Sequence, residues 1–275
     1  MGEYCKERFK DRNKINILEI GPGDGTFCKN FTQYLKEIEN YFVVDFSRRN
    51  ASYLKGLAYP LINEMGHLSV RDCSQDLVLA LEVLDDSPVE FMKRSNGELE
   101  IKVVDGVERY VPLKSLGQIG EDVLKNLEEA CVKVGEKEQL IPTGLIRTIS
   151  EANRILAPNG LFIAIDWFCG EDLPFKEPCF CKSRGTYMSR VNKDVIERLS
   201  KKYGLGLKFE LLRDFLEKTK MGERRGILFE TNETMEFVTE EELLHVNDFY
   251  KSELKPYYEW FSKEDFHILI LEKPS

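Results

Sequence analysis

The sequence predicts a single α/β domain whose core is a mostly parallel, doubly wound sheet. Two stretches carry this prediction: residues 15–45 read as strand, glycine turn, helix and strand, and residues 145–166 read as helix, turn and strand. The first order is the opening unit of a doubly wound sheet, in which a ligand binds beyond the carboxyl ends of the strands. A chain of 275 residues suits one such domain with insertions better than two independent domains.

The first unit begins with an apolar run at 15–20, which is typical of a strand buried on both faces of a parallel sheet. A helix is predicted from Thr26 to Glu39, where apolar residues recur at helical spacing. Tyr41–Val44 is a second buried strand, and Asp45 closes it. Residues 15–45 therefore predict the centre of the sheet.

The turn after the first strand contains three alternating glycines, Gly21, Gly23 and Gly25. A dinucleotide fingerprint would place its third glycine three residues after the second, where Thr26 stands, and the Lys-Ser/Thr pair of a phosphate loop is missing. Residues without side chains let a ligand approach the backbone closely. Asp45, at the end of the second strand, is placed to accept hydrogen bonds from a ligand. The alternative is a glycine-rich turn of another nucleotide-binding fold, with Asp45 an ordinary strand-end residue.

The run Glu-Ile-Gly-Pro-Gly-Asp-Gly at 19–25 resembles motif I of the class I S-adenosylmethionine (SAM) methyltransferases. The resemblance implies a Rossmann-like, seven-stranded, mostly parallel sheet with an antiparallel last strand, and SAM as the cofactor. Asp72 is expected near the adenine ring, and a plain loop carboxylate is an equal alternative. The residues that the resemblance assigns to the cofactor are Glu19, Gly21, Pro22, Gly23, Gly25, Asp45, Phe46, Asp72 and Leu81.

The middle of the chain adds a helix at 47–57, a weak strand at 66–70 and a clear buried strand at 76–82. Alternating residues at 98–104 and 107–111 flank Asp105-Gly106, a strong hairpin signal. An apolar helical stripe follows from Ile119 to Val134 and stops at Gly135. This hairpin and helix interrupt the strand–helix alternation, so residues of about 90–140 are predicted to form an insertion over the edge that carries the site.

The last part of the chain begins with a helical stripe from Leu145 to Leu156, a left-handed turn at Asn159-Gly160 and a fifth strand ending at Asp166. Residues 170–186 read as an irregular loop. Asn192 is predicted to cap a helix, and strands follow at 205–212 and, antiparallel, at 266–272. A second insertion is expected at about 213–263, and residues 1–275 are taken as one domain.

Residues 82–89, Glu-Val-Leu-Asp-Asp-Ser-Pro-Val, resemble the signature Asn-Glu-x-x-Asp-Ala-x-Pro-Val of the MidA-like methyltransferases. That family includes a protein arginine methyltransferase of mitochondrial complex I assembly. Leu81 replaces the signature Asn and Asp86 replaces its Ala. About fourteen residues precede motif I, where the family has a helical extension. The resemblance implies a protein acceptor, with arginine favoured.

Glu82 and Asp85 are the residues predicted to act on the acceptor. Carboxylates grip a guanidinium bidentately and can orient a nitrogen lone pair toward the methyl group. The structural alternative is that Glu82 caps the fourth strand and Asp85 is the N-cap of a helix. None of the three histidines follows the fourth or fifth strand, so the sequence offers no ready histidine base.

Charge and composition narrow the function classes. The chain has 48 acidic and 39 basic residues, a net charge of −9, which argues against nonspecific nucleic-acid binding. No apolar stretch approaches about 18 residues and no signal peptide is recognised, so the sequence predicts a cytoplasmic protein without a membrane partner. The seven cysteines include no Cys-x-x-Cys pair, and no metal site is predicted.

Three other functions stay open at the level of sequence. A small-molecule methyltransferase is favoured if the pocket under residues 170–186 is closed and narrow. An aminopropyltransferase shares the fold and also uses acidic residues near the fourth strand. The third alternative is not an enzyme: a SAM-binding assembly factor without turnover. Leu81 in place of the signature Asn favours it.

Overall fold

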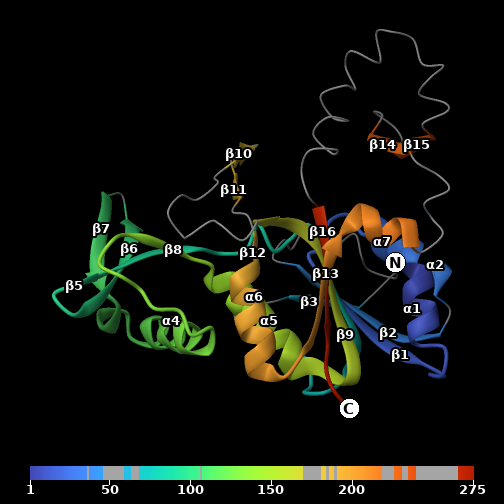
Figure 1. Cartoon of the computed structure of the whole chain (residues 1–275), viewed down its shortest axis with the longest axis horizontal. Helices are drawn as coiled ribbons and strands as arrows, with labels where there is room; N and C mark the ends of the chain where they lie inside the picture. The colour runs from blue at the N-terminus through green and yellow to red at the C-terminus, as the bar shows by residue number, and fades with distance from the viewer. Residues whose placement is uncertain are drawn as a thin grey trace, which may run out of the picture.

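The structure is a computed structural model, and Figure 1 shows how its elements are arranged. It describes residues 1–35, 37–45, 59–62, 68–105, 107–169, 181–183, 186–188, 191–218, 226–230, 235–239 and 266–275.

The main sheet has the mixed order expected for the predicted fold, β13-β16-β9-β4-β1-β2-β3. β1 pairs in parallel with β2 and β4, and β4 pairs in parallel with β9. β16 runs antiparallel to both of its neighbours, β9 and β13, which confirms the antiparallel last strand. Two-residue β12 adds an eighth strand beside β9. The strands are β1 (Ile15–Ile20), β2 (Ile38–Asp45), β3 (Tyr59–Ile62), β4 (Gln75–Leu81), β9 (Leu156–Cys169), β12 (Val191–Asn192), β13 (Gly206–Leu211) and β16 (Phe266–Glu272).

Helices cover both faces of this sheet (Figure 1). One face packs against α1 (Gly2–Arg8), α2 (Thr26–Tyr34) and α7 (Leu212–Lys218), and the other against α5 (Thr143–Ile155) and α6 (Lys193–Tyr203). Alternate residues of a strand face opposite sides. Ile17 therefore belongs to the hydrophobic cluster under α1, α2 and α7, and Leu18 to the cluster under α5 and α6. Burial on both faces explains why these strands are nearly continuous apolar runs.

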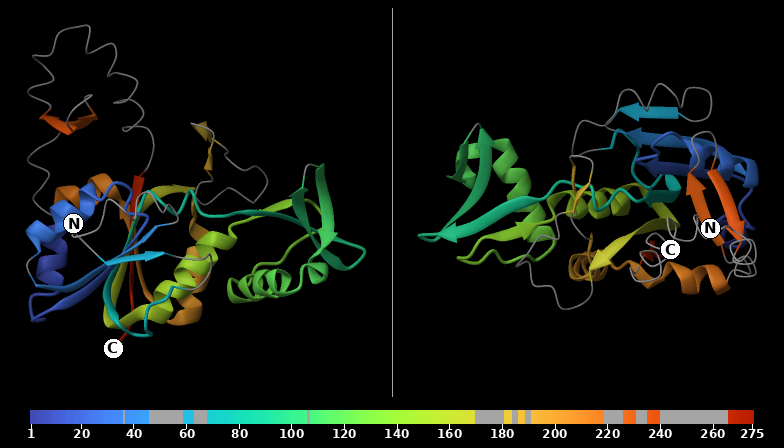
Figure 2. Two further views of the ribbon diagram at one scale, coloured as in Figure 1. Left: turned by 180° about the vertical axis from the view of Figure 1, so that it is seen from behind. Right: turned by 90° about the horizontal axis from the view of Figure 1, so that it is seen from above.

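A second, four-stranded antiparallel sheet projects from the main one, beyond α5 and α6 (Figure 2). Its order is β7-β6-β5-β8, and the apolar side chains of α4 join the same core cluster as its inner face. Its residues fall in the range predicted as an insertion. The elements are β5 (Glu90–Ser95), β6 (Glu98–Asp105), β7 (Val107–Pro112), the 3-10 turn η1 (Leu113–Leu116), α4 (Gln118–Glu129) and β8 (Gln139–Ile141).

Two hairpins lie in the remaining ranges. β10 (Cys181–Ser183) pairs with β11 (Thr186–Met188) inside the stretch predicted as an irregular loop. β14 (Gly226–Glu230) pairs with β15 (Met235–Thr239) inside the second predicted insertion. Among the described residues, no helix is both long and apolar enough to cross a bilayer.

Several local predictions are confirmed. Asn159 has a left-handed φ of 60°, and the Asn192 side chain accepts the N–H of Val195 at 3.1 Å, capping α6. The hairpin of β6 and β7 flanks position 106 as predicted. A further hairpin, between β5 and β6, turns through Asn96 and Gly97, whose φ values of 49° and 82° are those of a type I′ turn.

Two helix predictions were too long. The helix from Thr26 ends at Tyr34 rather than at Glu39, because Ile38 pairs with Ile15 and opens β2. α4 ends at Glu129 before Val134, and Ile119 in its first turn is 63% exposed rather than part of the apolar stripe.

The third strand was placed too late in the sequence. It lies at Tyr59–Ile62 beside β2, whereas Leu68 and Val70, part of the predicted strand, form no ladder. Their backbone groups bond to α5 instead: Glu151 accepts the Leu68 N–H, and Arg154 donates to both carbonyls. The helix predicted at 47–57 lies outside the described residues.

Candidate functional site

The glycine turn, residues 21–25, follows the carboxyl end of β1 and is hydrogen-bonded to the carboxyl end of β2. The N–H of Gly21 donates to the carbonyl of Val44 at 2.8 Å, and the N–H of Gly25 donates to the carbonyl of Pro22 at 2.9 Å. Gly21, Gly23 and Gly25 all have positive φ, at 65°, 55° and 81°. Other residues adopt this conformation at a cost of roughly 1–2 kcal/mol, so the local geometry of the turn explains the three glycines.

The turn leaves bare backbone where a ligand can approach. A Cβ atom on Gly23 would meet nothing within 4 Å. A Cβ on Gly21 would lie 2.5 Å from Cγ2 of Val83, in the segment after β4. The glycine turn therefore touches that segment on one side and is open on another. Asp45 lies at the carboxyl end of β2 beside it, and Phe46 lies outside the described residues. This arrangement fits SAM, whose ribose and amino-acid end need close backbone approach and a carboxylate acceptor.

Glu19 lies in β1 just before the turn and is buried, with 2% of its surface exposed. Its carboxylate accepts the hydroxyl of Tyr41 at 2.7 Å. Burial raises the pKa of Glu19 to about 7, although the Tyr41 hydrogen bond acts in the opposite direction. The Glu19 side chain therefore links β1 to Tyr41 of β2 two residues before the turn, and its charge changes near neutral pH.

The acidic segment, residues 82–86, follows β4 directly. Leu81 pairs with Ile165 at the end of the strand, and the N–H of Glu82 donates to the Ile165 carbonyl at 2.8 Å. Glu82 has a φ of 50°, a left-handed conformation that turns the chain sharply. Glu82 as a whole is exposed to solvent. Its carboxyl group is partly shielded from water by neighbouring atoms, which raises its pKa.

Asp85 is the buried carboxyl of the acidic segment. It is 5% exposed, and its Oδ1 has no hydrogen-bond partner among the described residues. Burial, and after it the charges of Asp166 and Asp86, raise the pKa of Asp85 to about 7. A buried polar atom without a partner is uncommon in folded proteins and calls for an explanation; a ligand cation is one.

Asp166 holds the acidic segment from β9. Its Oδ2 accepts the N–H groups of Val83, Leu84 and Asp85 at 3.1, 2.8 and 3.4 Å. Asp166 is 1% exposed, so it lies under the segment and not in an open pocket. Sequence reasoning placed it at the end of the fifth strand without finding this role, because the partners are backbone groups 81–83 residues away.

The structural alternatives for the predicted pair are not supported. No helix begins at Asp85, because residues 82–89 form turns that lead into β5, so the N-cap interpretation is wrong. No hydrogen bond joins the Glu82 carboxyl to a described residue. The start of α5 packs against Pro88, two residues after the acidic segment: a Cβ on Gly144 would lie 2.5 Å from Cδ of Pro88, and the Gly144 N–H donates to the Pro88 carbonyl at 2.8 Å.

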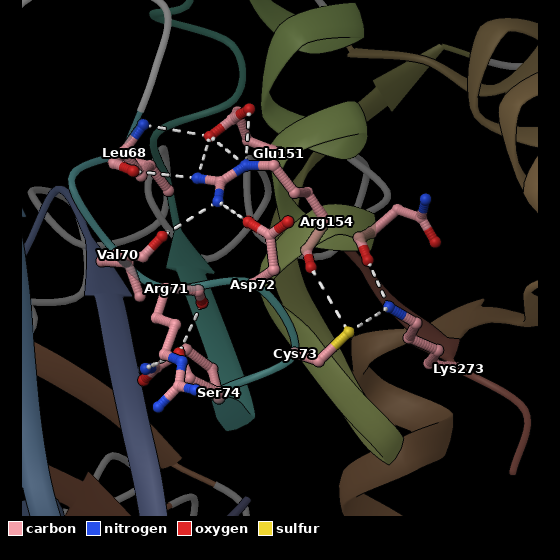
Figure 3. Close-up of polar contacts among 11 residues, drawn as sticks. Leu68, Val70, Arg71, Asp72, Cys73, Ser74, Glu151, Arg154 and Lys273 are labelled. Carbon is pink, nitrogen blue, oxygen red and sulfur yellow. Dashed lines mark hydrogen bonds and ion pairs between the residues drawn. The ribbon is translucent and has the colours of Figure 1, made fainter.

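Asp72 lies at the other end of the sheet. It precedes β4 at the amino end of that strand and pairs with Arg154 near the end of α5 (Figure 3). The glycine turn and the acidic segment follow the carboxyl ends of β1 and β4, which run parallel. The structure therefore brings Glu19, the glycines, Asp45, Leu81, Glu82 and Asp85 to one edge, and it does not bring Asp72 there.

Comparison with solved structures supports the fold. A COG1565 superfamily member from Burkholderia thailandensis, bound to S-adenosyl-homocysteine, matches at 14% identity with a TM-score of 0.59, over 99% of this chain and 75% of that one. A SAM-dependent methyltransferase from Methanosarcina mazei matches at 12% identity and 0.47, over 96% and 94%. Haemonchus contortus phosphoethanolamine N-methyltransferase 2, in complex with SAM, matches at 13% and 0.49, over 98% and 51%.

Comparison with sequences places the chain in a family. No curated protein sequence matches it. A family model does: Methyltransf_28, described as "Putative S-adenosyl-L-methionine-dependent methyltransferase", matches residues 1–195. That range contains the glycine turn, Asp45, the acidic segment and Asp166. The chain therefore belongs to the Methyltransf_28 family and is a SAM-dependent methyltransferase.

Proposed function

We propose that this methyltransferase modifies a nitrogen of a protein side chain, with arginine the favoured acceptor. The observation that carries the proposal is the buried carboxyl of Asp85 beside Glu82, whose Oδ1 has no hydrogen-bond partner among the described residues. It lies close to the glycine turn through the Val83–Gly21 contact. A guanidinium cation would supply the missing hydrogen bonds and the opposite charge. The resemblance of residues 82–89 to the MidA-like signature supports the same acceptor.

The chemistry requires alignment and removal of a proton. SAM supplies the methyl group as an electrophile on sulfur. The acceptor nitrogen forms a bond to the methyl carbon as the carbon–sulfur bond breaks, and the nitrogen gives up one proton. We assign that proton to Asp85, because a carboxylate with a pKa of about 7 accepts protons effectively near neutral pH. Glu82 would orient the cation from the open side of the site.

The net charge of −9 is compatible with a cationic acceptor group. The free thiols of Cys5, Cys28, Cys73 and Cys131 fit a reducing compartment such as the cytoplasm. Residues 170–180, which would help to tell an open groove from a closed pocket, lie outside the described residues. The small-molecule and assembly-factor alternatives are therefore separated by experiment.

The test uses labelled methyl groups from SAM, the purified protein and a cell lysate. Glu82→Gln and Asp85→Asn should lower methyl incorporation into protein by about 100-fold or more, with SAM affinity measured by calorimetry little changed. Glu121→Gln, which removes an exposed carboxylate of α4 away from the site, is the matched control.

Each outcome decides between the readings. Full activity of either variant on the true acceptor would remove that residue from the mechanism. Label that appears in small molecules and never in protein would favour the small-molecule reading. SAM binding without any transfer, together with one co-purifying protein, would favour the assembly factor. A preference for decarboxylated SAM in competition would point to aminopropyl transfer.

A further inference from the structure

Asp166 combines three features that a plain strand-end carboxylate lacks. It is almost fully buried, it accepts three successive backbone N–H groups, and those groups belong to the acidic segment, while Asp166 itself belongs to β9. The segment has no ladder or helix of its own. Its shape therefore depends on this carboxylate.

The cost of losing Asp166 would fall on the acidic segment first. Leu84 and Asp85 are 3% and 5% exposed, so water could not readily replace the carboxylate oxygen as acceptor for their N–H groups. Leaving a buried N–H without a partner destabilises the folded state. The segment would move to recover hydrogen bonds, and Asp85 and Glu82 would move with it.

We propose that Asp166 is a positioning residue, whose buried carboxylate fixes the acidic segment so that Glu82 and Asp85 face the acceptor beside Gly21. This role rests on the proposed function for its purpose, since it positions the pair assigned above to the acceptor. Its physical content, three hydrogen bonds and one nearby charge, can be measured without any acceptor.

The charge of Asp166 gives the role a distinctive signature. Asp85 takes its raised pKa from burial first and then from Asp166, with Asp86 and Glu82 of its own segment contributing further. His267 is the cross-strand neighbour of Asp166 on β16. On α5, whose start packs against Pro88 just after the segment, the charged Arg147 acts on Glu90. Neutralising Asp166 should therefore lower the pKa of Asp85 while the amides of residues 83–85 stay protected from exchange. Loss of packing, which would expose Asp85 to water, would lower its pKa and deprotect those amides together.

Two substitutions separate hydrogen bonding from charge. Asp166→Asn keeps an oxygen acceptor of the same shape and removes the charge. The amides of residues 83–85 should therefore stay protected from hydrogen exchange, while the pKa of Asp85 falls by about one unit. Asp166→Ala removes both, and exchange of the same amides should rise by about tenfold or more. Carboxyl-carbon NMR follows the titration of Asp85 in the full-length protein.

Asp76→Asn is the matched control. Asp76 is 7% exposed on β4, accepts the N–H of Asn16 at 2.8 Å and pairs with Arg12. It is thus a buried carboxylate of similar kind at the opposite edge of the sheet. Its variant should lose stability without changing the titration of Asp85 or exchange at 83–85.

The results would overturn the proposal in two ways. Unchanged exchange at 83–85 in Asp166→Ala would show that the three bonds do not hold the segment. An unchanged Asp85 titration in Asp166→Asn would show that the two carboxylates are not coupled. If the wild-type protein transfers no methyl group, the proposed function fails, and these two measurements still decide whether Asp166 positions the segment.

Discussion

The Arg154 network and the Asp85 carboxyl, which lie at opposite ends of the parallel strands, are built in opposite ways. At the amino edge, the guanidinium of Arg154 donates to the carbonyls of Leu68 at 2.8 Å and Val70 at 2.9 Å, and it pairs with Glu151 at 2.7 Å and with Asp72 (Figure 3). At the carboxyl edge, Asp85 has an oxygen without a partner.

The difference separates stability from function. A polar network in which every group is bonded makes the structure rigid, while a buried carboxyl without a partner costs stability. Folding alone gives no reason to keep such a group, whereas binding a cation does. Asp85 is therefore the group to test for function, and the Arg154 network should affect stability alone.

The largest expected effect on SAM binding comes from adding a side chain where the glycine turn touches the acidic segment. In Gly21→Ala, the new Cβ would lie 2.5 Å from Val83 Cγ2 at a φ of 65°. Conformational strain of about 1–2 kcal/mol and displacement of Val83 add up, so SAM affinity should fall by more than about tenfold. Calorimetric titration with SAM measures the loss.

The contact itself can be isolated. Val83→Ala in the same chain removes the clashing methyl groups and should restore part of the affinity. Gly204→Ala, at a similar φ of 67° with nothing within 4 Å, should lower stability while SAM affinity stays the same. Failure of Val83→Ala to restore binding would mean that strain in the turn, and not the contact with the segment, explains the loss.

The next prediction concerns the stability that the Arg154 network provides at the amino ends of the strands. Arg154→Met keeps the apolar stem and removes the guanidinium from two carbonyls and two carboxylates, so the free energy of unfolding should fall by about 2–4 kcal/mol. SAM affinity should be unchanged. Urea denaturation and calorimetry test the two halves. Asp72→Asn should leave SAM affinity unchanged as well; a clear loss there would restore the adenine contact expected from the resemblance.

The smallest effect uses pH at the carboxyl edge. The pKa of Asp85 is about 7 in the folded protein against an ordinary 3.8, so the folded state holds a proton that the unfolded state releases earlier. This group's contribution to stability is therefore present below about pH 4 and falls as the pH rises to about 7. Asp85→Asn should be more stable than wild type at pH 8 by about 1–3 kcal/mol.

Urea denaturation at pH 5 and pH 8 measures that gain. Glu19, whose pKa is also about 7, gives the variant a residual pH dependence of the same sign. An Asp85→Asn protein with the wild-type pH dependence would mean that Asp85 is already ionised in the folded protein.

The parts predicted correctly from sequence are those with local causes. Residues 15–20 and 77–81 are mainly apolar because both faces of a parallel strand are buried, and the glycines at 21–25 follow from positive φ. The carboxylates after the strands were expected at one end of the sheet because parallel strands end together, and their roles stay predictions.

The parts that were missed depend on partners far away in sequence. Leu68 and Val70 read as a strand, yet α5 takes their backbone groups through Arg154, 84–86 residues later. The position of Asp72 gives no sign of the edge at which it lies until the register of β4 is known. The role of Asp166 needs three N–H groups that carry no side-chain signal.

The place of β16 has a consequence for how the chain is made. β16 follows every other described strand in sequence, yet it lies between β9 and β13 and pairs with both. The N–H of Lys273, just after it, donates to the carbonyl of Gly160 at 3.0 Å. During synthesis, β9 and β13 therefore each keep one unpaired strand edge until residues 266–272 leave the ribosome. Unpaired backbone groups along such an edge can pair with strands of other chains. The growing chain is most exposed to aggregation immediately before its sheet closes.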